Sequence, residues 1–371
     1  MEHFYNLIII SFLRIKHFFR SFTQDARTVF GTGAVGISSL WNTSGLKNIF
    51  NWSVFLFFSA LLIRCGSFRD EGTTIFSDNI LIQHRPIRLK DNVVQCAYKS
   101  PTQEYWFGTA EGLLRFDGQT WTGYSTADGL PGQDIRAIAG GEDGSLWIGT
   151  EMGLCQFKNN FTALSDPLLF EKQIIALARW GDSLLIGSTE GFFIYRFSNQ
   201  QVLKPSLPTQ DQGLTNIRVI EVVPPKIILG TYAGILYYEP KSGWRLCQEQ
   251  NGLPSNIIYA IQFDTQRGQV WMGTAAGLCF ADTQFQSFHS IDSSRGFPNS
   301  LVTSLVLKGP TLWAGTLEGL VRLNINDLSL QTLEIRQGLA HNTIKSLFAD
   351  ESFIWIGHIL NGITRYKIKG G

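Results

Sequence analysis

A twelve-residue phrase returns seven times along this chain, and no other feature limits the possible folds as strongly. Residues 146–157 read LWIGTEMGLCQF, and near-copies such as YWFGTAEGLLRF (105–116) and VWMGTAAGLCFA (270–281) lie before and after it. The first glycine of the phrase recurs at intervals of 38 to 43 residues, at Gly108, Gly149, Gly187, Gly230, Gly273, Gly315 and Gly357. A fixed period of this length indicates a repeat architecture in which each unit packs against its neighbours.

Each repeat has the pattern of strands rather than of helices. In residues 135–160 the apolar run IRAIA is followed by the turn EDGS, the run LWIGT, the turn EMG and the run LCQFKNN, which leads to a last run near FTALS. Short apolar runs between glycine-containing turns are typical of antiparallel strands. Four-stranded units that repeat without helices between them predict an all-β fold, a seven-bladed β-propeller of four-stranded antiparallel blades.

The two ends of the predicted propeller are expected to pair. The last repeat contains only three predicted strands, the third around TRYKIK (364–369). Residues 77–89, SDNILIQHRPIRL, contain a strand-like run just before the first repeat, where the fourth strand of a preceding blade would fall. We expect this run to pair with TRYKIK, because closing the ring removes two exposed sheet edges. The predicted propeller therefore covers residues 77–371.

The chain ahead of the propeller belongs to another class of sequence. Residues 49–63 form an uncharged apolar run, which has the length of a signal-peptide core and is shorter than a bilayer span of about 20 residues. Cations predominate before the run, which places that side in the cytoplasm. We predict an N-terminal extension (1–48), a signal peptide or membrane anchor (49–66), a linker (67–76) and a periplasmic or extracellular propeller in the cell envelope. The alternative is that residues 5–63 form core helices of a soluble domain.

The end of the apolar run resembles a bacterial lipoprotein signal, in which a cysteine is acylated. Leu62 and Cys65 fit that pattern, whereas Arg64 departs from the small residues preferred before the cysteine. A lipid anchor at Cys65, a cleaved signal peptide and a retained helix remain open. The chain has no CxxC pair, so we expect neither a disulfide framework nor a thiolate metal site. Cys155 and Cys279 hold the same repeat position and are predicted to lie in the core.

Charge and motif content exclude several functions. Thirty-one Lys and Arg residues against 30 Asp and Glu residues leave a formal charge of +1, so no overall field attracts nucleic acid. The propeller's histidines are scattered, and the propeller sequence contains no HExxH, GxSxG or phosphate-binding loop. We therefore expect no cofactor, no metal site and no nucleic-acid partner. The histidines are His84, His289, His341 and His358.

One position in the first strand of each blade carries polar residues that the core does not require. It follows the apolar residue that opens the strand, and along the chain it holds Gln95, Arg136, Ile175, Arg218, Tyr259, Thr303 and Lys345. In a propeller this end of the strand lies at the channel mouth, where ligands usually bind. We predict that an oligosaccharide or an anionic ligand is bound there, because Arg holds carboxylates and Tyr stacks on rings. The predicted ligand residues are Arg136, Arg218, Tyr259, Lys345 and Gln95. Alternatively, these side chains only join neighbouring blades by hydrogen bonds.

A second phrase connects the repeats and points to a family. DGLPGQ (128–133) and NGLPSN (251–256) are two of its copies. Its pairing with LWIGT-x-x-GL closely resembles the two-component regulator propeller repeat, over about residues 80–371. The resemblance implies a membrane-tethered, sensor-like binding module with a sensor kinase or an envelope protein as partner. Members of that family commonly continue into a second propeller, a membrane helix and a kinase. This sequence instead stops after the third predicted strand of its last repeat. We therefore expect a stand-alone propeller without a kinase.

An enzymatic alternative also follows from resemblance. Seven-bladed streptogramin lyases use a histidine and a divalent cation at the channel mouth, which would make this chain a periplasmic lyase or hydrolase acting on a polysaccharide or a small cyclic substrate. His341, in a link, is the best candidate base. Because the sequence lacks a convergent set of acid, base and metal ligands, it favours the binding module.

Overall fold

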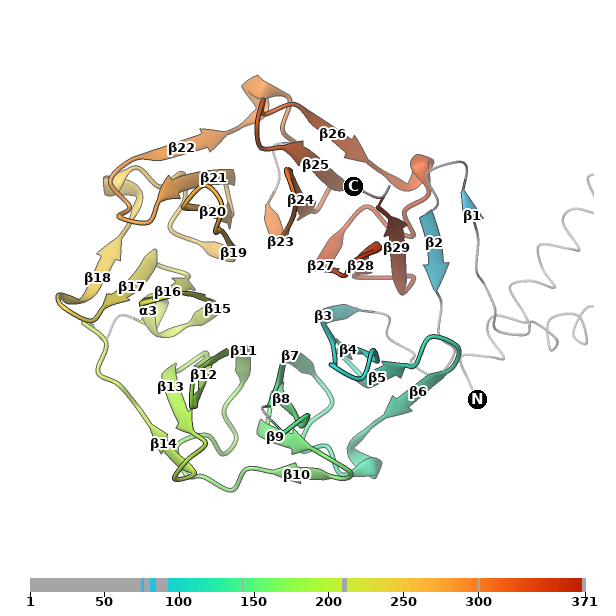
Figure 1. Ribbon diagram of the computed structural model, residues 1–371, viewed down its shortest axis with the longest axis vertical. Coiled ribbons are helices and arrows are strands. Elements are labelled where there is room, and N and C mark those ends of the chain that lie inside the picture. Colours follow the sequence, from blue (N-terminus) through green and yellow to red (C-terminus); the bar gives the residue numbers. More distant parts are fainter. Residues whose placement is uncertain are drawn as a thin grey trace, which may run out of the picture. The chain divides into compact units, whose positions relative to one another are not determined.

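Seven antiparallel sheets form a ring in the part of the chain that the structure describes (Figure 1). The computed structural model describes residues 93–368 except 142, 209–211 and 299–300, together with the backbone of 75–76 and 81–84. Six of these sheets have four strands and one has five, which confirms the predicted seven-bladed propeller. The predicted extension, the apolar run and Cys65 lie outside the described residues. None of the helices among the described residues is long and apolar enough to cross a membrane.

Each of blades one to six begins with its innermost strand and ends with its outermost (Figure 1). Blades one to three contain β3 (Val94–Lys99), β4 (Tyr105–Thr109), β5 (Gly112–Phe116) and β6 (Trp121–Tyr124); β7 (Ile135–Gly140), β8 (Leu146–Thr150), β9 (Gly153–Phe157) and β10 (Phe161–Ala163); and β11 (Ile174–Trp180), β12 (Ser183–Ser188), β13 (Gly191–Arg196) and β14 (Gln201–Leu203). Blades four to six contain β15 (Ile217–Val223), β16 (Lys226–Thr231), β17 (Ile235–Glu239) and β18 (Gly243–Cys247); β19 (Ile258–Asp264), β20 (Gln269–Thr274), β21 (Gly277–Asp282) and β22 (Phe288–Ile291); and β23 (Val302–Lys308), β24 (Thr311–Thr316), β25 (Leu320–Asn324) and β26 (Leu330–Leu333).

Blade seven is completed by the start of the propeller sequence. Its own strands are β27 (Ile344–Ala349), β28 (Phe353–His358) and β29 (Ile363–Lys367), and β2 (Leu81–His84) pairs antiparallel with β29 in the register Leu81 to Tyr366. This pairing confirms the predicted closure of the ring. A further strand, β1 (Ile75–Phe76), pairs with β2 and was not expected from the sequence.

Side chains of the first and last blades also join across the closure. The Tyr105 hydroxyl donates to Asp350 at 2.7 Å, and the indole N–H of Trp355 donates to the same carboxylate at 2.9 Å. Ser346 Oγ donates to the Val94 carbonyl at 2.8 Å. Asp350 is buried, so removing either donor would leave a buried carboxylate oxygen without one of its partners.

The first glycine of the repeated phrase provides the contact between blades. A Cβ atom at Gly149 would lie 2.7 Å from Cγ2 of Ile174, the residue that opens the next blade. The same clash would occur at Gly357, where Val94 of blade one is 2.8 Å away. The phrase therefore recurs because each second strand must leave room for the aliphatic side chain of its neighbour.

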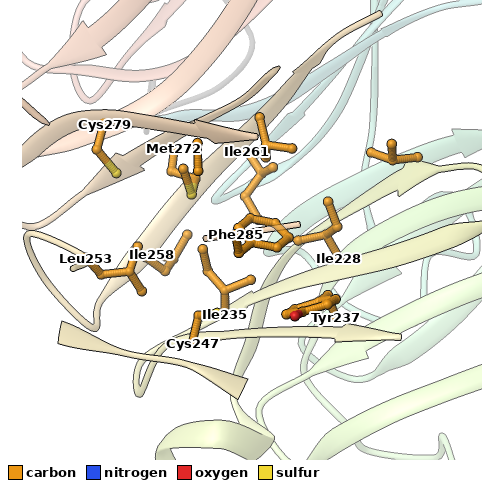
Figure 2. Close-up of a cluster of buried hydrophobic side chains, with 13 residues drawn as sticks. Ile228, Ile235, Tyr237, Cys247, Leu253, Ile258, Ile261, Met272, Cys279 and Phe285 are labelled. Atoms are coloured by element: carbon orange, nitrogen blue, oxygen red, sulfur yellow. The ribbon is translucent and has the colours of Figure 1, made fainter. Parts of the chain in front are cut away.

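The core consists of apolar layers between adjacent blades. Figure 2 shows one layer, in which Ile228 and Ile235 of blade four pack with Ile258 and Met272 of blade five. Cys279 belongs to the same layer and Cys155 to another, and both thiols are fully buried, as the sequence predicted.

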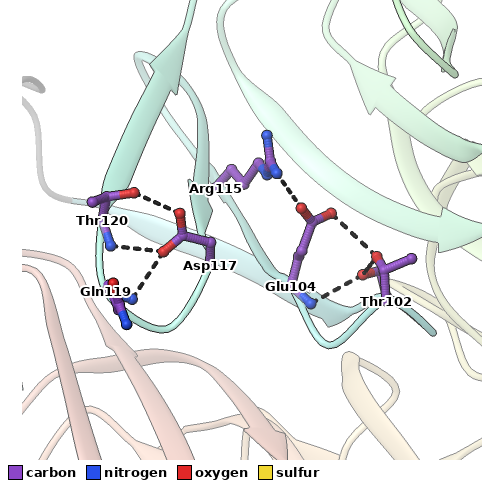
Figure 3. Close-up of polar contacts among 7 residues, drawn as sticks. Thr102, Glu104, Arg115, Asp117, Gln119 and Thr120 are labelled. Atoms are coloured by element: carbon purple, nitrogen blue, oxygen red, sulfur yellow. Dashed lines mark hydrogen bonds and ion pairs between the residues drawn. The ribbon is translucent and has the colours of Figure 1, made fainter.

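The two faces of the ring differ in which loops they present. Because consecutive strands are antiparallel, the links between blades and the turns between second and third strands share one face, here called the link face. The turns on the other face are fixed by polar side chains, as Figure 3 shows for blade one. Asp117 accepts hydrogen bonds from the Thr120 hydroxyl at 2.6 Å and from the Thr120 and Gln119 amides, which lower its pKa to about 2. Arg115 pairs with Glu104 nearby.

Candidate ligand-binding site

A β-bulge lies near the start of the innermost strand of every described blade. The pairing with the second strand skips one residue, and the skipped residues are Gln95, Arg136, Ile175, Arg218, Tyr259, Thr303 and Lys345. These are the seven residues of the variable position identified in the sequence. A bulge redirects the extra residue away from the regular alternation of the strand. Because of the bulges, the side chain at this position does not have to pack in the apolar core of its blade.

All seven bulge residues line one central cavity of about 330 Å³ at the link face. Ile344, which opens β27, and four residues from links and turns complete the wall: Leu301, Leu317, Thr343 and Ile359. The structure thus brings together the five predicted ligand residues. The volume is at the low end of the range for small-molecule sites, which is about 300–1,000 Å³.

Arg136 is paired within the protein. Its Nε and Nη2 atoms lie 2.8 Å and 2.6 Å from one carboxylate oxygen of Asp134, in the link that enters blade two. Gln95 of blade one donates to the other oxygen of Asp134. These contacts join blades one and two and neutralise one of the cations at the cavity. For Gln95 and Arg136 they agree with the alternative that the side chains join neighbouring blades by hydrogen bonds.

Arg218 has aromatic neighbours instead of an acidic partner. Its Nε atom is buried without a hydrogen-bond partner, and its guanidinium lies 5.1 Å from the ring centre of Tyr232. The Tyr232 and Tyr259 rings meet edge to face with centres 6.1 Å apart. Burial lowers the pKa of Arg218, and the charge of Arg136 lowers it further.

Lys345 is the third cation of the cavity. Its side chain makes no hydrogen bond or ion pair with any residue that the structure describes. Burial lowers its pKa, and so do the positive charges of Arg218 and Arg136, whereas Asp134 acts in the opposite direction. The charges of Arg218 and Arg136 both act on Lys345, as expected for three cations that line one cavity and give it a positive potential.

The other two bulge residues are less suited to bind an anion. The Thr303 hydroxyl lies 2.7 Å from the Ile344 carbonyl and 3.0 Å from the Gly315 carbonyl, so it connects blades six and seven. Ile175 is a buried aliphatic residue. The polar part of the wall is therefore formed by Gln95, Arg136, Arg218, Tyr259 and Lys345.

Sequence reasoning did not find the apolar part of the wall. Leu301, Leu317 and Ile359 come from a link and two turns, and no pattern in the sequence distinguishes them from other loop residues. Asp134 was also missed, although its place two residues before Arg136 was visible. Large exposed apolar side chains in the described chain all lie in links, at the link-face end of an outer strand or in turns of the link face: Met152, Leu168, Phe170, Leu203, Tyr232, Leu317, Ile335 and Leu360.

No histidine side chain among the described residues lines this cavity. His341, the candidate base, does not line the cavity, and its Nδ1 atom accepts a hydrogen bond from the Thr343 amide at 2.9 Å. His358 replaces the Thr or Ser of the other repeats, is fully buried 2.9 Å from Thr364 Oγ1, and has its pKa lowered by burial to about 3. Within the described residues no group of three or more His, Cys, Asp and Glu side chains is arranged to hold a metal ion.

Comparisons with known proteins agree with the fold and the repeat. A family model described as "two component regulator propeller" matches residues 129–152, which include a link, Arg136 and the first two strands of blade two. No curated protein matches the sequence.

Several solved structures are similar to this chain. The extracellular domain of BT4673 from B. thetaiotaomicron, described as a one component or a hybrid two component system, has a TM-score of 0.67 and 22% identity over 81% of this chain and 40% of that chain. The extracellular domain of the hybrid two component system BT3049 from the same organism has a TM-score of 0.63 and 18% identity over 75% and 40%. Virginiamycin B lyase from Staphylococcus aureus has a TM-score of 0.63 and 12% identity over 78% and 99%.

These identities show a shared fold. The chain spans about 40% of the length of the BT4673 and BT3049 domains, and nearly all of the lyase.

Proposed function

We propose that this seven-bladed propeller, in which residues 129–152 match the two component regulator propeller model, is a sensor-like module that binds an anionic, sugar-like ligand at its channel mouth. The observation that supports the proposal is the convergence of the seven bulge residues on one cavity, where three cations and a tyrosine face the same space. Arg and Lys supply charge-assisted hydrogen bonds to acidic groups, and Tyr259 supplies a flat surface for a sugar ring.

The cellular setting belongs to the same proposal. The extracellular domains of BT4673 and BT3049, which share this fold, support a place in the cell envelope, with the propeller outside the cytoplasm and residues 49–63 acting as signal or anchor. A sensor kinase or an envelope protein would then receive the signal. A reporter that is active only in the periplasm, fused after Gly371, should be active; an inactive reporter on an accumulated full-length chain would reject the export. Acyl labelling of the wild type and of Cys65→Ser tests the lipid anchor separately.

Binding is tested by four single variants in parallel with stability. Arg136→Ala, Arg218→Ala, Tyr259→Ala and Lys345→Ala should each weaken binding of the full-length protein to acidic saccharides on a glycan array. The fold should remain intact in thermal unfolding, except for a loss in Arg136→Ala, which leaves Asp134 without its cation. Variants that lose stability while array binding is unaltered would reject the site.

We propose binding rather than turnover, because the residue best placed by sequence to act as a base, His341, is not part of the cavity wall. The lyase alternative predicts that the protein converts its ligand. Chromatography of any saccharide retained by the array, before and after incubation with the protein, distinguishes the two: unchanged ligand supports a sensor and a new product supports an enzyme.

A further inference from the structure

The charges around the cavity do not balance. Three cations, Arg136, Arg218 and Lys345, line its wall, and Asp134 is the one carboxylate that the structure places in contact with any of them. Since Asp134 is occupied by Arg136 and Gln95, two positive charges remain without a counter-ion among the described residues.

Such an arrangement is unfavourable in the free protein. A partly buried charge loses hydration, and it regains stability only when an opposite charge or hydrogen-bond acceptors replace the water. Arg218 cannot avoid this cost by losing its proton, because a guanidinium stays charged in proteins. Its Nε–H is also buried without an acceptor among the described residues.

We propose that Arg218 and Lys345 form a subsite for a part of the ligand that carries two negative charges, either one doubly charged phosphate group or two carboxylates. The inference rests on the proposed function and specifies its ligand class. Arg218 on β15 and Lys345 on β27 line the same cavity from blades four and seven, and the charge of Arg218 acts on Lys345. The ligand body then lies against Tyr259 and the apolar residues Leu317 and Ile359.

Matched pairs of ligands isolate the second charge. Glucose 6-phosphate carries close to two charges at pH 7.5, because the second phosphate pKa is about 6, whereas glucose 6-sulfate has the same sugar and one charge. Galactarate and galactonate, both open-chain, form the corresponding pair for two carboxylates against one. Calorimetric titration of the full-length wild type should give, in at least one pair, an affinity about ten-fold higher for the dianion, which corresponds to about 1.4 kcal/mol. The pair that responds identifies the source of the two charges.

Four variants assign the preference to the subsite. Arg218→Gln and Lys345→Gln should each reduce the dianion preference to less than about two-fold. Either change leaves a single uncompensated cation in the cavity, and a monoanion already pairs with it. Arg196→Gln and Lys367→Gln are the matched controls, because both side chains are exposed at strand ends on the opposite face, and they should keep the wild-type preference.

The outcomes separate this inference from the function beneath it. A wild type that binds monoanions and dianions equally, while the alanine variants above still lose array binding, would overturn the dianion subsite and leave the channel-mouth site in place. A dianion preference that persists in both Arg218→Gln and Lys345→Gln would also overturn it. Failure of every titration together with unaltered array binding in all four alanine variants would overturn both.

Discussion

At the scale of single residues, the cations of the cavity differ in what holds them. Arg136 has a carboxylate partner that also receives Gln95 of the neighbouring blade, whereas Arg218 has aromatic contacts and a buried Nε–H without an acceptor. The same repeat position thus contains one residue that stabilises the ring and one whose charge is not compensated by the fold.

Stability measurements should reveal this difference. Arg136→Ala should lower the free energy of unfolding by about 1–3 kcal/mol, because Asp134 loses charge-assisted hydrogen bonds. Arg218→Gln should leave the free energy of unfolding unchanged or raise it by roughly 1 kcal/mol, because it removes an uncompensated charge. Urea unfolding of both variants, with Arg196→Gln as the neutral control, checks the contrast. Equal losses in Arg136→Ala and Arg218→Gln would show that both residues join blades.

Glu221 gives a second prediction at this scale. Its carboxylate faces blade five and accepts a hydrogen bond from the Phe263 amide at 3.0 Å, and burial raises its pKa to about 7. In the unfolded chain the group ionises near its ordinary pKa of 4.5. Its contribution to stability therefore is greatest below pH 4.5, falls as the pH rises toward 7, and is constant above that.

The substitution Glu221→Gln keeps the acceptor for the Phe263 amide and removes the titration. The melting temperature of this variant minus that of the wild type should therefore increase from pH 5 to pH 8. Thermal unfolding of both proteins at the two pH values is the measurement. A difference between them that does not change with pH would mean that Glu221 is not desolvated in the folded ring.

At the scale of elements, the sequence predicted strands and blades well but did not predict the bulges. The period of the glycines and the position of the apolar runs determine the blades, because each of these residues has a steric task such as the contact of Gly149 with Ile174. A bulge depends on the pairing of two strands, and residues as different as Gln95, Ile175 and Tyr259 occupy it, so it has no residue signature. The convergence of the position was predictable from the topology of propellers, whereas Asp134 and the apolar wall required the structure.

The closing strand supplies the prediction at this scale. Deleting residues 67–90 removes β1 and β2 and exposes the edge of β29, so the melting temperature should fall severely. Deleting residues 2–48 removes more chain but no described strand, and it serves as the control in the same thermal unfolding experiment. An unchanged melting temperature after the first deletion would contradict the role of the closing strands in stability.

At the scale of the whole molecule, the seven blades act as a scaffold that carries seven side chains to one point. No single repeat contains a site, since the cations come from blades two, four and seven and the tyrosine from blade five. The opposite face has tight polar turns such as that of Asp117, and the large exposed apolar side chains of the described chain lie on the link face. Charge, cavity and exposed apolar surface thus coincide on one side of the ring, as a binding module requires.

Hydrogen exchange of the full-length protein with and without the acidic saccharide that binds best on the array tests this claim most directly. Ligand-dependent protection should appear in peptides that contain the bulges, such as 94–96, 217–219 and 344–346, and in the turns of the link face. The turns of the opposite face, including 117–120, should exchange at the same rate in both samples. Protection confined to the outer strands or to the opposite face would contradict a site at the channel mouth.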